Sequence, residues 1–236
     1  MNRKKDFVRE LDVADYAPVS TARIREGVEW LIAYSYNSKD FASPRVLLIG
    51  DSICNSYRDG VRDALAGKIN VSFWASSKAV DDPAYFDELY YMLSAMRYDL
   101  ITLNNGLHSL DGSDMTEWEE CFRSAVKMIR DAQPGAKIAV TLTTAGRDER
   151  TNGRVKEINP ILLRVAEEFS LPVIDLFSIT NSLDRGTDWA DNVHFREGAR
   201  AMLAKAVSDY ALSVIGTADG EKLGEAHSAM GPDGAI

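Results

Sequence analysis

A serine, a histidine and an aspartate have the types and local settings that nucleophilic catalysis needs. Ser52 follows Gly50 and Asp51 directly after an apolar run. His194 stands three residues after Asp191. At this spacing a carboxylate can fold back to accept a hydrogen bond from imidazole Nδ1, which leaves Nε2 free to act as a base. If the fold brings these side chains together, the hydroxyl becomes an activated nucleophile.

Both motifs also have ordinary structural interpretations. A serine that opens a helix commonly caps it, and an aspartate before a helix can do the same. Asp188 is a competing carboxylate, although its spacing from His194 is less suitable. Neither motif alone decides between catalysis and structure.

A third polar segment, residues 104–108, has the sequence Asn-Asn-Gly-Leu-His. Amide N–H groups are good donors to an oxyanion, so an asparagine here could stabilise developing negative charge. Asn-Gly is also a strong turn signal, and we expect a turn that does not exclude a functional asparagine. Because successive strand residues point to opposite faces, Asn104 and Asn105 cannot both reach one site easily.

The elements that must position these residues are visible as apolar patterns. Between short apolar runs, apolar residues recur every three or four positions in 116–130, 159–169 and 195–215, which indicates helices. This alternation predicts an α/β fold, a three-layer α/β/α sandwich with a mainly parallel five-stranded sheet. The runs, which are typical of strands buried on both faces, are Val46–Ile49, Ile69–Phe73, Leu100–Leu103, Ile138–Leu142 and Pro172–Leu176.

The predicted sheet fixes where the chemistry should lie. In open α/β sheets the site lies beyond the carboxyl ends of the strands. We therefore expect functional residues just after Ile49, Phe73, Leu103 and Leu142. The serine and the 104–108 segment both satisfy this expectation.

The chain organises as one domain with two flanking segments. The domain is predicted to span residues 45–215, and residues 1–44 form an N-terminal extension with a helix at Thr21–Leu31, capped near Ser20 or Thr21. Residues 216–236 are rich in glycine and alanine and are predicted to be a flexible tail. The sequence leaves the oligomeric state open.

Composition narrows the partners and the location. Of 236 residues, 27 are Lys or Arg and 36 are Asp or Glu, a net charge of −9 that argues against nucleic acid and anionic membranes as partners. No apolar stretch of about 20 residues could span a bilayer, and the N-terminus lacks the apolar region of a secretory signal. Cys54 and Cys121 make no disulfide framework, so we expect reduced thiols and a cytoplasmic location.

Taken together, the three polar segments resemble the SGNH (GDSL-type) hydrolase family. The matching residues are Gly50-Asp51-Ser52, the 104–108 segment and Asp191-Asn192-Val193-His194, within a resemblance that spans about residues 45–215. The resemblance implies a flavodoxin-like, SGNH-hydrolase type of fold. It also implies Ser52 as the nucleophile, His194 as the general base and then acid, and Asp191 as its orienter, with no metal or organic cofactor.

The family's oxyanion hole uses backbone N–H groups of the nucleophile and of a glycine after the second strand. In this chain the corresponding segment, residues 73–79, contains no glycine. The resemblance then leaves the backbone N–H of Lys78 or Ala79 as the replacement.

The family's third block usually reads Gly-x-Asn-Asp. Aligning it on Gly106 places His108 where the asparagine should be. The segment instead resembles a subgroup with an N-x-G-L-H third block, which Asn104 fits. Asn104 and His108 are thus the preferred side-chain donors, with Asn105 behind them.

The resemblance implies a serine esterase that removes a small acyl group, an acetyl group, from a carbohydrate or small molecule. An acyltransferase of the same fold is the first alternative. A non-catalytic carbohydrate-binding protein is another, because the glycine of the second block is missing. A nucleotide-binding protein ranks last, because the phosphate-binding fingerprints are absent. Trp74, Trp189 and Phe195 could form an apolar or sugar-stacking wall, although most aromatic residues are simply core.

Overall fold

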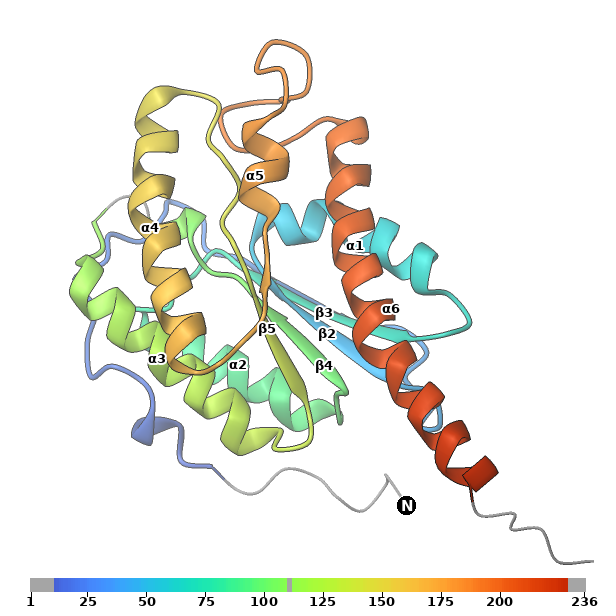
Figure 1. Ribbon diagram of the computed structural model, residues 1–236. Coiled ribbons are helices and arrows are strands. Elements are labelled where there is room, and N and C mark those ends of the chain that lie inside the picture. The colour runs from blue at the N-terminus through green and yellow to red at the C-terminus, as the bar shows by residue number, and fades with distance from the viewer. Residues whose placement is uncertain (1–10, 110–111, 229–236) are drawn as a thin grey trace, which may run out of the picture.

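The computed structural model describes residues 11–109 and 112–228. Its centre is a six-stranded sheet with the strand order β1-β3-β2-β4-β5-β6 (Figure 1). β1 runs antiparallel to β3, and all other neighbouring strands are parallel. The strands are β1 (Leu31–Ser35), β2 (Arg45–Gly50), β3 (Asn70–Ser76), β4 (Leu100–Leu103), β5 (Lys137–Thr141) and β6 (Val173–Ile174).

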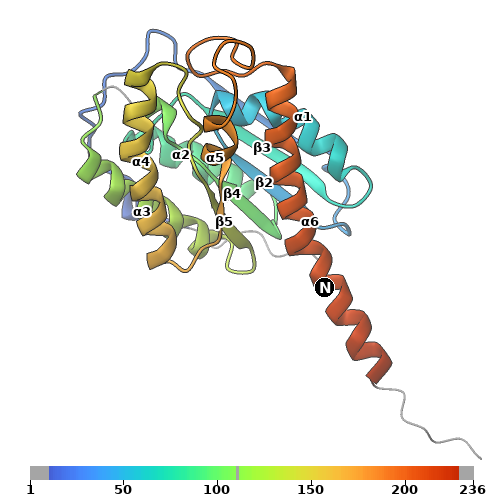
Figure 2. The ribbon, with the colours of Figure 1, turned by 45° about the horizontal axis from the view of Figure 1, so that its top comes forward.

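Helices cover both faces of the sheet, which makes the three-layer sandwich that the sequence predicts (Figures 1 and 2). α1 and α6 pack on one face and share a buried apolar cluster with alternate residues of β2 and β3. α2, α3 and α4 form a second cluster on the other face. The helices are α1 (Ser52–Leu65), α2 (Pro83–Ala95), α3 (Met115–Ala132), α4 (Glu149–Glu168), α5 (Leu176–Asn181) and α6 (Glu197–Ser228), with short 3₁₀ helices at Val13–Asp15 and Leu107–Ser109.

The α/β class and the five predicted strands are confirmed, but the strand count is wrong by one. The sixth strand is β1, which pairs along one side of β3 through residues such as Ala33 and Trp74. Because β1 lies before residue 45, the predicted domain boundary leaves out part of the sheet. α6 also continues to Ser228. The segment predicted as a flexible tail from residue 216 is therefore helical as far as Ser228.

The predicted helix at Thr21–Leu31 is wrong. Residues 21–30 are irregular, and Leu31 begins β1. Ile24 and Val28, which a helix would place on one face with Leu31, are exposed, so this face is not buried against the rest of the described chain. Long-range polar contacts fix the segment instead.

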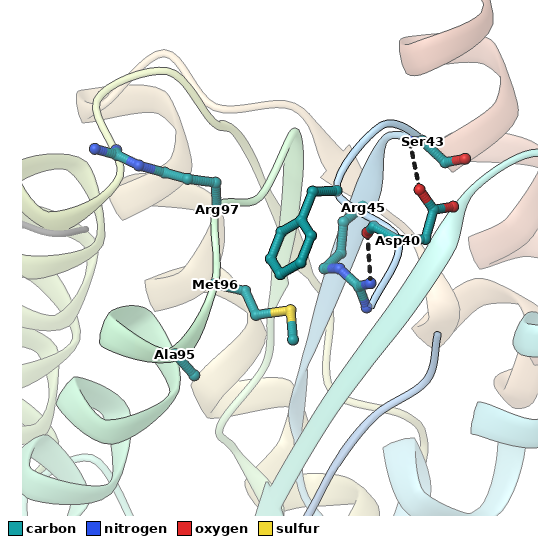
Figure 3. Close-up of a pocket in the computed structure, with 7 residues that line it drawn as sticks. Asp40, Ser43, Arg45, Ala95, Met96 and Arg97 are labelled. Carbon is teal, nitrogen blue, oxygen red and sulfur yellow. Dashed lines mark hydrogen bonds between the residues drawn. The ribbon is translucent and has the colours of Figure 1, made fainter. Parts of the chain in front are cut away.

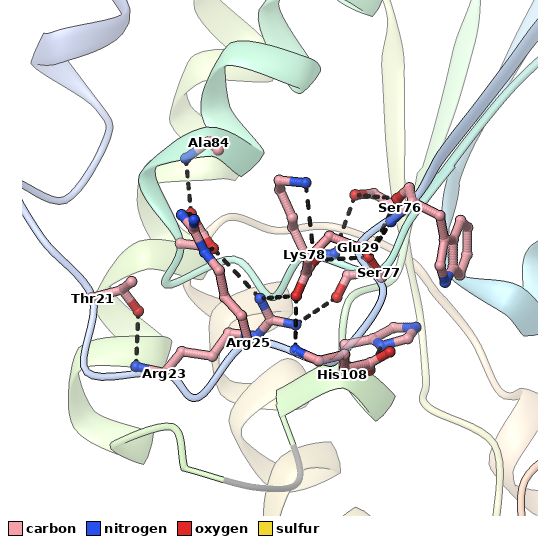
Figure 4. A network of polar contacts seen from close by, with 12 residues as sticks. Thr21, Arg23, Arg25, Glu29, Ser76, Ser77, Lys78, Ala84 and His108 are labelled. Carbon is pink, nitrogen blue, oxygen red and sulfur yellow. Dashed lines mark hydrogen bonds and ion pairs between the residues drawn. The ribbon is translucent and has the colours of Figure 1, made fainter.

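Those contacts tie residues 21–30 to the loop between β3 and α2 (Figure 4). The buried guanidinium of Arg23 donates to the carbonyl of Ser77 at 2.7 Å and pairs with Asp82 at 3.4 Å. Arg25 pairs with the same carboxylate at 2.8 Å, and the N–H of Trp30 donates to Ser77 Oγ at 2.8 Å. The N-terminal segment therefore buttresses one of the loops at the carboxyl ends of the strands.

The carboxyl group of Asp82 is fully buried, and burial acts to raise its pKa. The hydrogen bonds from Arg25 and from the backbone of Ala84, together with the charges of Arg25 and Arg23, outweigh that effect and lower the pKa below its usual value. The carboxylate is thus held in its charged form by its partners.

The opposite end of the sheet carries a small pocket of about 30 Å³, next to the start of β2 (Figure 3). Arg45 lines it, but its buried guanidinium donates to the carbonyls of Tyr36 and Asn37 at 2.7 and 2.9 Å. These bonds tie the turn after β1 to β2. We assign this cluster a structural role.

Replacing Asp82 by Asn should lower the free energy of unfolding by about 2 kcal/mol, because the buried Arg23 keeps only Glu29, at 3.2 Å, as a counter-charge and Arg25 loses its charged partner. Asparagine keeps the cap on α2, so the change isolates the charge. Asp59→Asn, which alters an exposed pair with Arg62, should cost less than about 1 kcal/mol. Urea denaturation of both variants checks this, and equal losses would contradict it.

Candidate active site

Ser52 is the first residue of α1, directly beyond the end of β2. The cap of this helix is Asp51, whose Oδ1 accepts the N–H of Ile53 at 2.9 Å. The serine hydroxyl is therefore not used as the cap. A side chain at Gly50 would lie 2.5 Å from Cβ of Cys54, so glycine is needed where the strand turns into the helix.

The structure brings Ser52, His194 and Asp191 together in one chain of hydrogen bonds. Ser52 Oγ lies 2.8 Å from His194 Nε2. His194 Nδ1 lies 2.8 Å from Asp191 Oδ2. Both distances are ordinary for hydrogen bonds, and the order hydroxyl–imidazole–carboxylate is the one that activates a nucleophile.

The loop before α6 holds the histidine through short local bonds. Asp191 Oδ1 accepts the backbone N–H groups of Val193 and His194 at 2.9 and 2.8 Å. Trp189 and Phe195 flank the loop, form an isolated antiparallel bridge, and pack their rings 4.3 Å apart. The loop is thus anchored at both ends.

Of the two roles considered for Trp74, Trp189 and Phe195, the structure supports the core and not a pocket wall, because all three are buried, at 3% exposure or less. Two of them serve instead as anchors of the loop that carries His194. Burial of these large rings supplies more stability than an exposed wall would allow.

The carboxyl of Asp191 is set up to remain ionised. Burial acts to raise its pKa, but hydrogen bonds from the backbone of His194 and Val193 and from the imidazole lower it below the usual value. An ionised carboxylate beside Nδ1 keeps the proton on that nitrogen. The competing carboxylate, Asp188, accepts the N–H of Asp184 at 3.0 Å and so holds the preceding turn.

The 104–108 segment follows β4, the strand next to β2. Asn104 turns toward β5, where its Nδ2 donates to the carbonyl of Thr141 at 2.7 Å and to Thr143 Oγ1 at 3.3 Å. Gly106 is required here, since a Cβ on it would lie 2.0 Å from that hydroxyl oxygen. Both acceptors of Asn104 Nδ2 are thus protein oxygens, and the bond to Thr143 Oγ1 is the longer one.

Asn105 points to the other side, as the alternation along the chain predicts. It is 1% exposed and bonds the loop between β3 and α2, accepting from Val80 N at 2.7 Å and donating to the carbonyl of Lys78 at 2.8 Å. Its amide is thus occupied by the protein itself.

His108 contacts the N-terminal segment. Its Nδ1 lies 2.5 Å from Glu26 Oε1, and the ring packs edge-on against Trp30 with centroids 5.8 Å apart (Figure 4). Its Nε2 is buried without a hydrogen-bond partner among the described residues. Sequence reasoning missed Glu26, because the two residues are 82 positions apart and no local pattern links them.

Of the two residues predicted in the loop after β3, Lys78 has its backbone N–H bonded to Ser76 Oγ at 3.1 Å. Its ammonium pairs with Glu88 at 3.0 Å. Ala79 is fully buried. Within residues 11–109 and 112–228, no acceptor takes the N–H of Ala79.

Histidine, cysteine, aspartate and glutamate side chains nowhere gather in threes as a metal site in the described part of the chain. None of the helices that the structure describes combines the length and apolar character needed to cross a membrane.

Sequence comparison and structural comparison give different results. No family model matches the sequence, and no curated protein matches it. An acetylxylan esterase from Geobacillus stearothermophilus aligns with a TM-score of 0.59 and 18% identity, over 73% of this chain and 94% of that chain. A lipase/acylhydrolase from Enterococcus faecalis gives a TM-score of 0.59 and 18% identity, over 71% and 95%.

A protein described as a GDSL-like lipase from Parabacteroides merdae also aligns, with a TM-score of 0.59 and 16% identity, over 74% of this chain and 96% of that chain. These structures match nearly their full length to this chain. The likeness extends over about three quarters of this chain, and it confirms the predicted fold.

Neither cysteine should react as a nucleophile in the folded protein. Both are buried, and burial raises the pKa of each thiol to about 12. Because the thiolate is the reacting form, Ellman's reagent at pH 8 should detect no thiol until the chain is unfolded, and then both. Rapid reaction of Cys54 before unfolding would contradict this and would make Cys54 a candidate nucleophile beside Ser52.

The chain therefore has the fold of acetylxylan esterases and GDSL-like lipases, and it carries a hydroxyl–imidazole–carboxylate chain at the carboxyl end of the sheet.

Proposed function

We propose that this protein is a serine esterase of the SGNH (GDSL-type) family that hydrolyses a small acyl ester. The observation that carries the proposal is the pair of 2.8 Å contacts linking Ser52 Oγ, His194 and Asp191. The likeness to ester-hydrolysing proteins supports the same reaction class. A catalytic mutant of the Geobacillus enzyme is a serine-to-alanine change, which agrees with a hydroxyl nucleophile.

The reaction follows from the contacts. His194 Nε2 takes the proton of Ser52 as Oγ attacks the ester carbonyl carbon, and the carbonyl electron pair moves onto its oxygen. The imidazolium then gives the proton to the leaving alkoxide, and the acyl group stays on Ser52. Water, deprotonated by the same imidazole, releases the acid and restores the hydroxyl. Asp191 holds the ring and stabilises its charged form.

Three donors are proposed for the oxyanion. They are the backbone N–H of Ser52 at the N-terminus of α1, the backbone N–H of Ala79, and Nδ2 of Asn104. Ala79 is preferred over Lys78, whose N–H already has an acceptor. Nδ2 of Asn104 already donates to Thr141 O and, at 3.3 Å, to Thr143 Oγ1, so the longer bond must open to the oxyanion. Nε2 of His108, which is buried without a hydrogen-bond partner among the described residues, is the alternative side-chain donor.

The proposed substrate is an acetyl ester on a carbohydrate or small molecule. The structural neighbours named as acetylxylan esterases support this class, and those named as lipases support an ester substrate in general. The missing glycine of residues 73–79 is the observation in favour of the carbohydrate-binding alternative, and no observation favours the acyltransferase. The two free thiols support a cytoplasmic location.

Ser52→Ala should lower kcat/KM for p-nitrophenyl acetate by at least about 10³-fold, because the nucleophile is removed. Ser56→Ala is the matched control. Its hydroxyl lies one turn further along α1 and donates to the carbonyl of Ile53, so its loss should change the rate by less than about twofold. Equal rates for wild type and Ser52→Ala would overturn the proposal.

Asp191→Asn should reduce kcat by about 10³- to 10⁴-fold, because an amide no longer holds the proton on Nδ1. Asp188→Asn makes the same change in a neighbouring carboxylate that only caps a turn. Steady-state kinetics should show a large loss of kcat in Asp191→Asn and little loss in Asp188→Asn. A comparable loss in both variants would indicate that kcat depends on the fold of the loop and not on the charge of Asp191.

A further inference from the structure

Asn105 makes two hydrogen bonds to the loop between β3 and α2, one on each side of a single residue. We call this pair of bonds the clamp. Its Nδ2 donates to the carbonyl of Lys78, and its Oδ1 accepts from Val80 N, at 2.8 and 2.7 Å. The residue between them is Ala79. Because Asn105 is 1% exposed, water does not compete for these bonds, and the grip is firm.

The strand order places this contact at the same end of the sheet as the proposed nucleophile. β2 lies between β3 and β4 in the sheet. A loop that leaves β3 and bonds a side chain at the end of β4 must cross the carboxyl end of β2. Ser52 begins α1 at that end, so Ala79 and Ser52 share the carboxyl end of β2.

The clamp also fixes the direction of one N–H group. In a planar trans peptide the carbonyl oxygen and the N–H point in opposite directions. The Lys78 carbonyl is held by Asn105, so the N–H of the same peptide group, that of Ala79, is held pointing away from Asn105. Ala79 is fully buried, yet its N–H meets no acceptor in the part of the chain that the structure describes.

A buried backbone N–H without a partner is rare and calls for a reason. A donor fixed in advance and shielded from water is what stabilises an oxyanion best, since no reorganisation is needed during the reaction. We take the missing acceptor to be a substrate oxygen that gains charge, which the site must admit on binding because Ala79 has no exposed surface without it.

We propose that Asn105 is a positioning residue, which orients the Lys78–Ala79 peptide so that the Ala79 N–H donates to the ester carbonyl oxygen as Ser52 attacks. The inference rests on the proposed esterase function. It gives Asn105 a role through Ala79 instead of a direct contact with substrate. It also accounts for a loop that carries no glycine, because the amide clamp sets the peptide orientation.

The kinetic consequence is specific. The N–H gains most of its interaction only when charge develops on the carbonyl oxygen, so misorienting it raises the barrier without weakening substrate binding. Asn105→Ala should therefore lower kcat for p-nitrophenyl acetate by about 10- to 100-fold, with KM within about twofold of wild type.

Gln133→Ala is the matched control. Gln133 is equally buried, and its side-chain amide likewise bonds main-chain groups, the carbonyls of Leu93 and Met96 and the N–H of Tyr98. These lie at the amino end of β4, far from Ser52. This variant should lose stability in urea denaturation but keep kcat within about twofold of wild type.

A thionoester separates orientation from general loosening. Sulfur accepts weaker hydrogen bonds than oxygen, so a misplaced donor matters less for O-(p-nitrophenyl) thionoacetate. The ratio of acetate to thionoacetate turnover should shrink in Asn105→Ala and stay unchanged in Gln133→Ala. Unchanged kcat in Asn105→Ala, or an equal loss on both esters, would overturn the inference while leaving the esterase intact.

A measurement on the wild-type protein covers the case in which Asn105→Ala does not fold. A crystal structure after reaction with a p-nitrophenyl alkylphosphonate should place a phosphonyl oxygen within about 3 Å of Ala79 N. An adduct on Ser52 whose oxygens avoid Ala79 would refute the role of Asn105. Failure to modify Ser52, together with full activity of Ser52→Ala, would instead refute the esterase proposal itself.

Discussion

The hydrogen bond between Ser52 Oγ and His194 Nε2 joins residues 142 positions apart, and the proposed chemistry depends on it. It can form only if the start of α1 meets the loop before α6. The two helices pack closely on one face of the sheet, and a side chain at Gly60 would lie 2.8 Å from Cβ of Ala204. Close packing at this glycine helps to set the distance at which the histidine reaches the serine.

The parts of the fold that could be predicted are those in which local pattern and final environment agree. The parallel strands are short apolar runs because they are buried on both faces, and Asp191 binds His194 because three residues of one loop suffice. Residues 21–30 follow a different principle. Their conformation depends on Arg23 finding Asp82 and Ser77, more than 50 positions away, and no local signal encodes that.

The same limit explains why the donors after β4 could not be ranked from sequence. Alternation correctly separates Asn104 from Asn105, but each side chain's partner comes from a different element. β5 occupies the amide of Asn104, the β3–α2 loop occupies that of Asn105, and Glu26 of the N-terminal segment occupies Nδ1 of His108. The order of the motifs is enough to predict Ser52 and His194 as site residues. The partners of these three side chains depend on the full fold and cannot be predicted in this way.

The two halves of the proposed site are built differently, and the difference fits their tasks. The side chains of His194 and Asp191 are 38% and 57% exposed and are held by a short loop, which leaves the imidazole room to exchange protons with serine, leaving group and water. Ala79 and Asn105 are buried and held by fixed amide bonds. Stabilising an oxyanion requires dipoles that do not move as charge appears. The β3–α2 loop is therefore the more rigidly held half of the proposed site. The N-terminal segment, residues 21–30, bonds this loop and so helps to hold the proposed oxyanion donor in place.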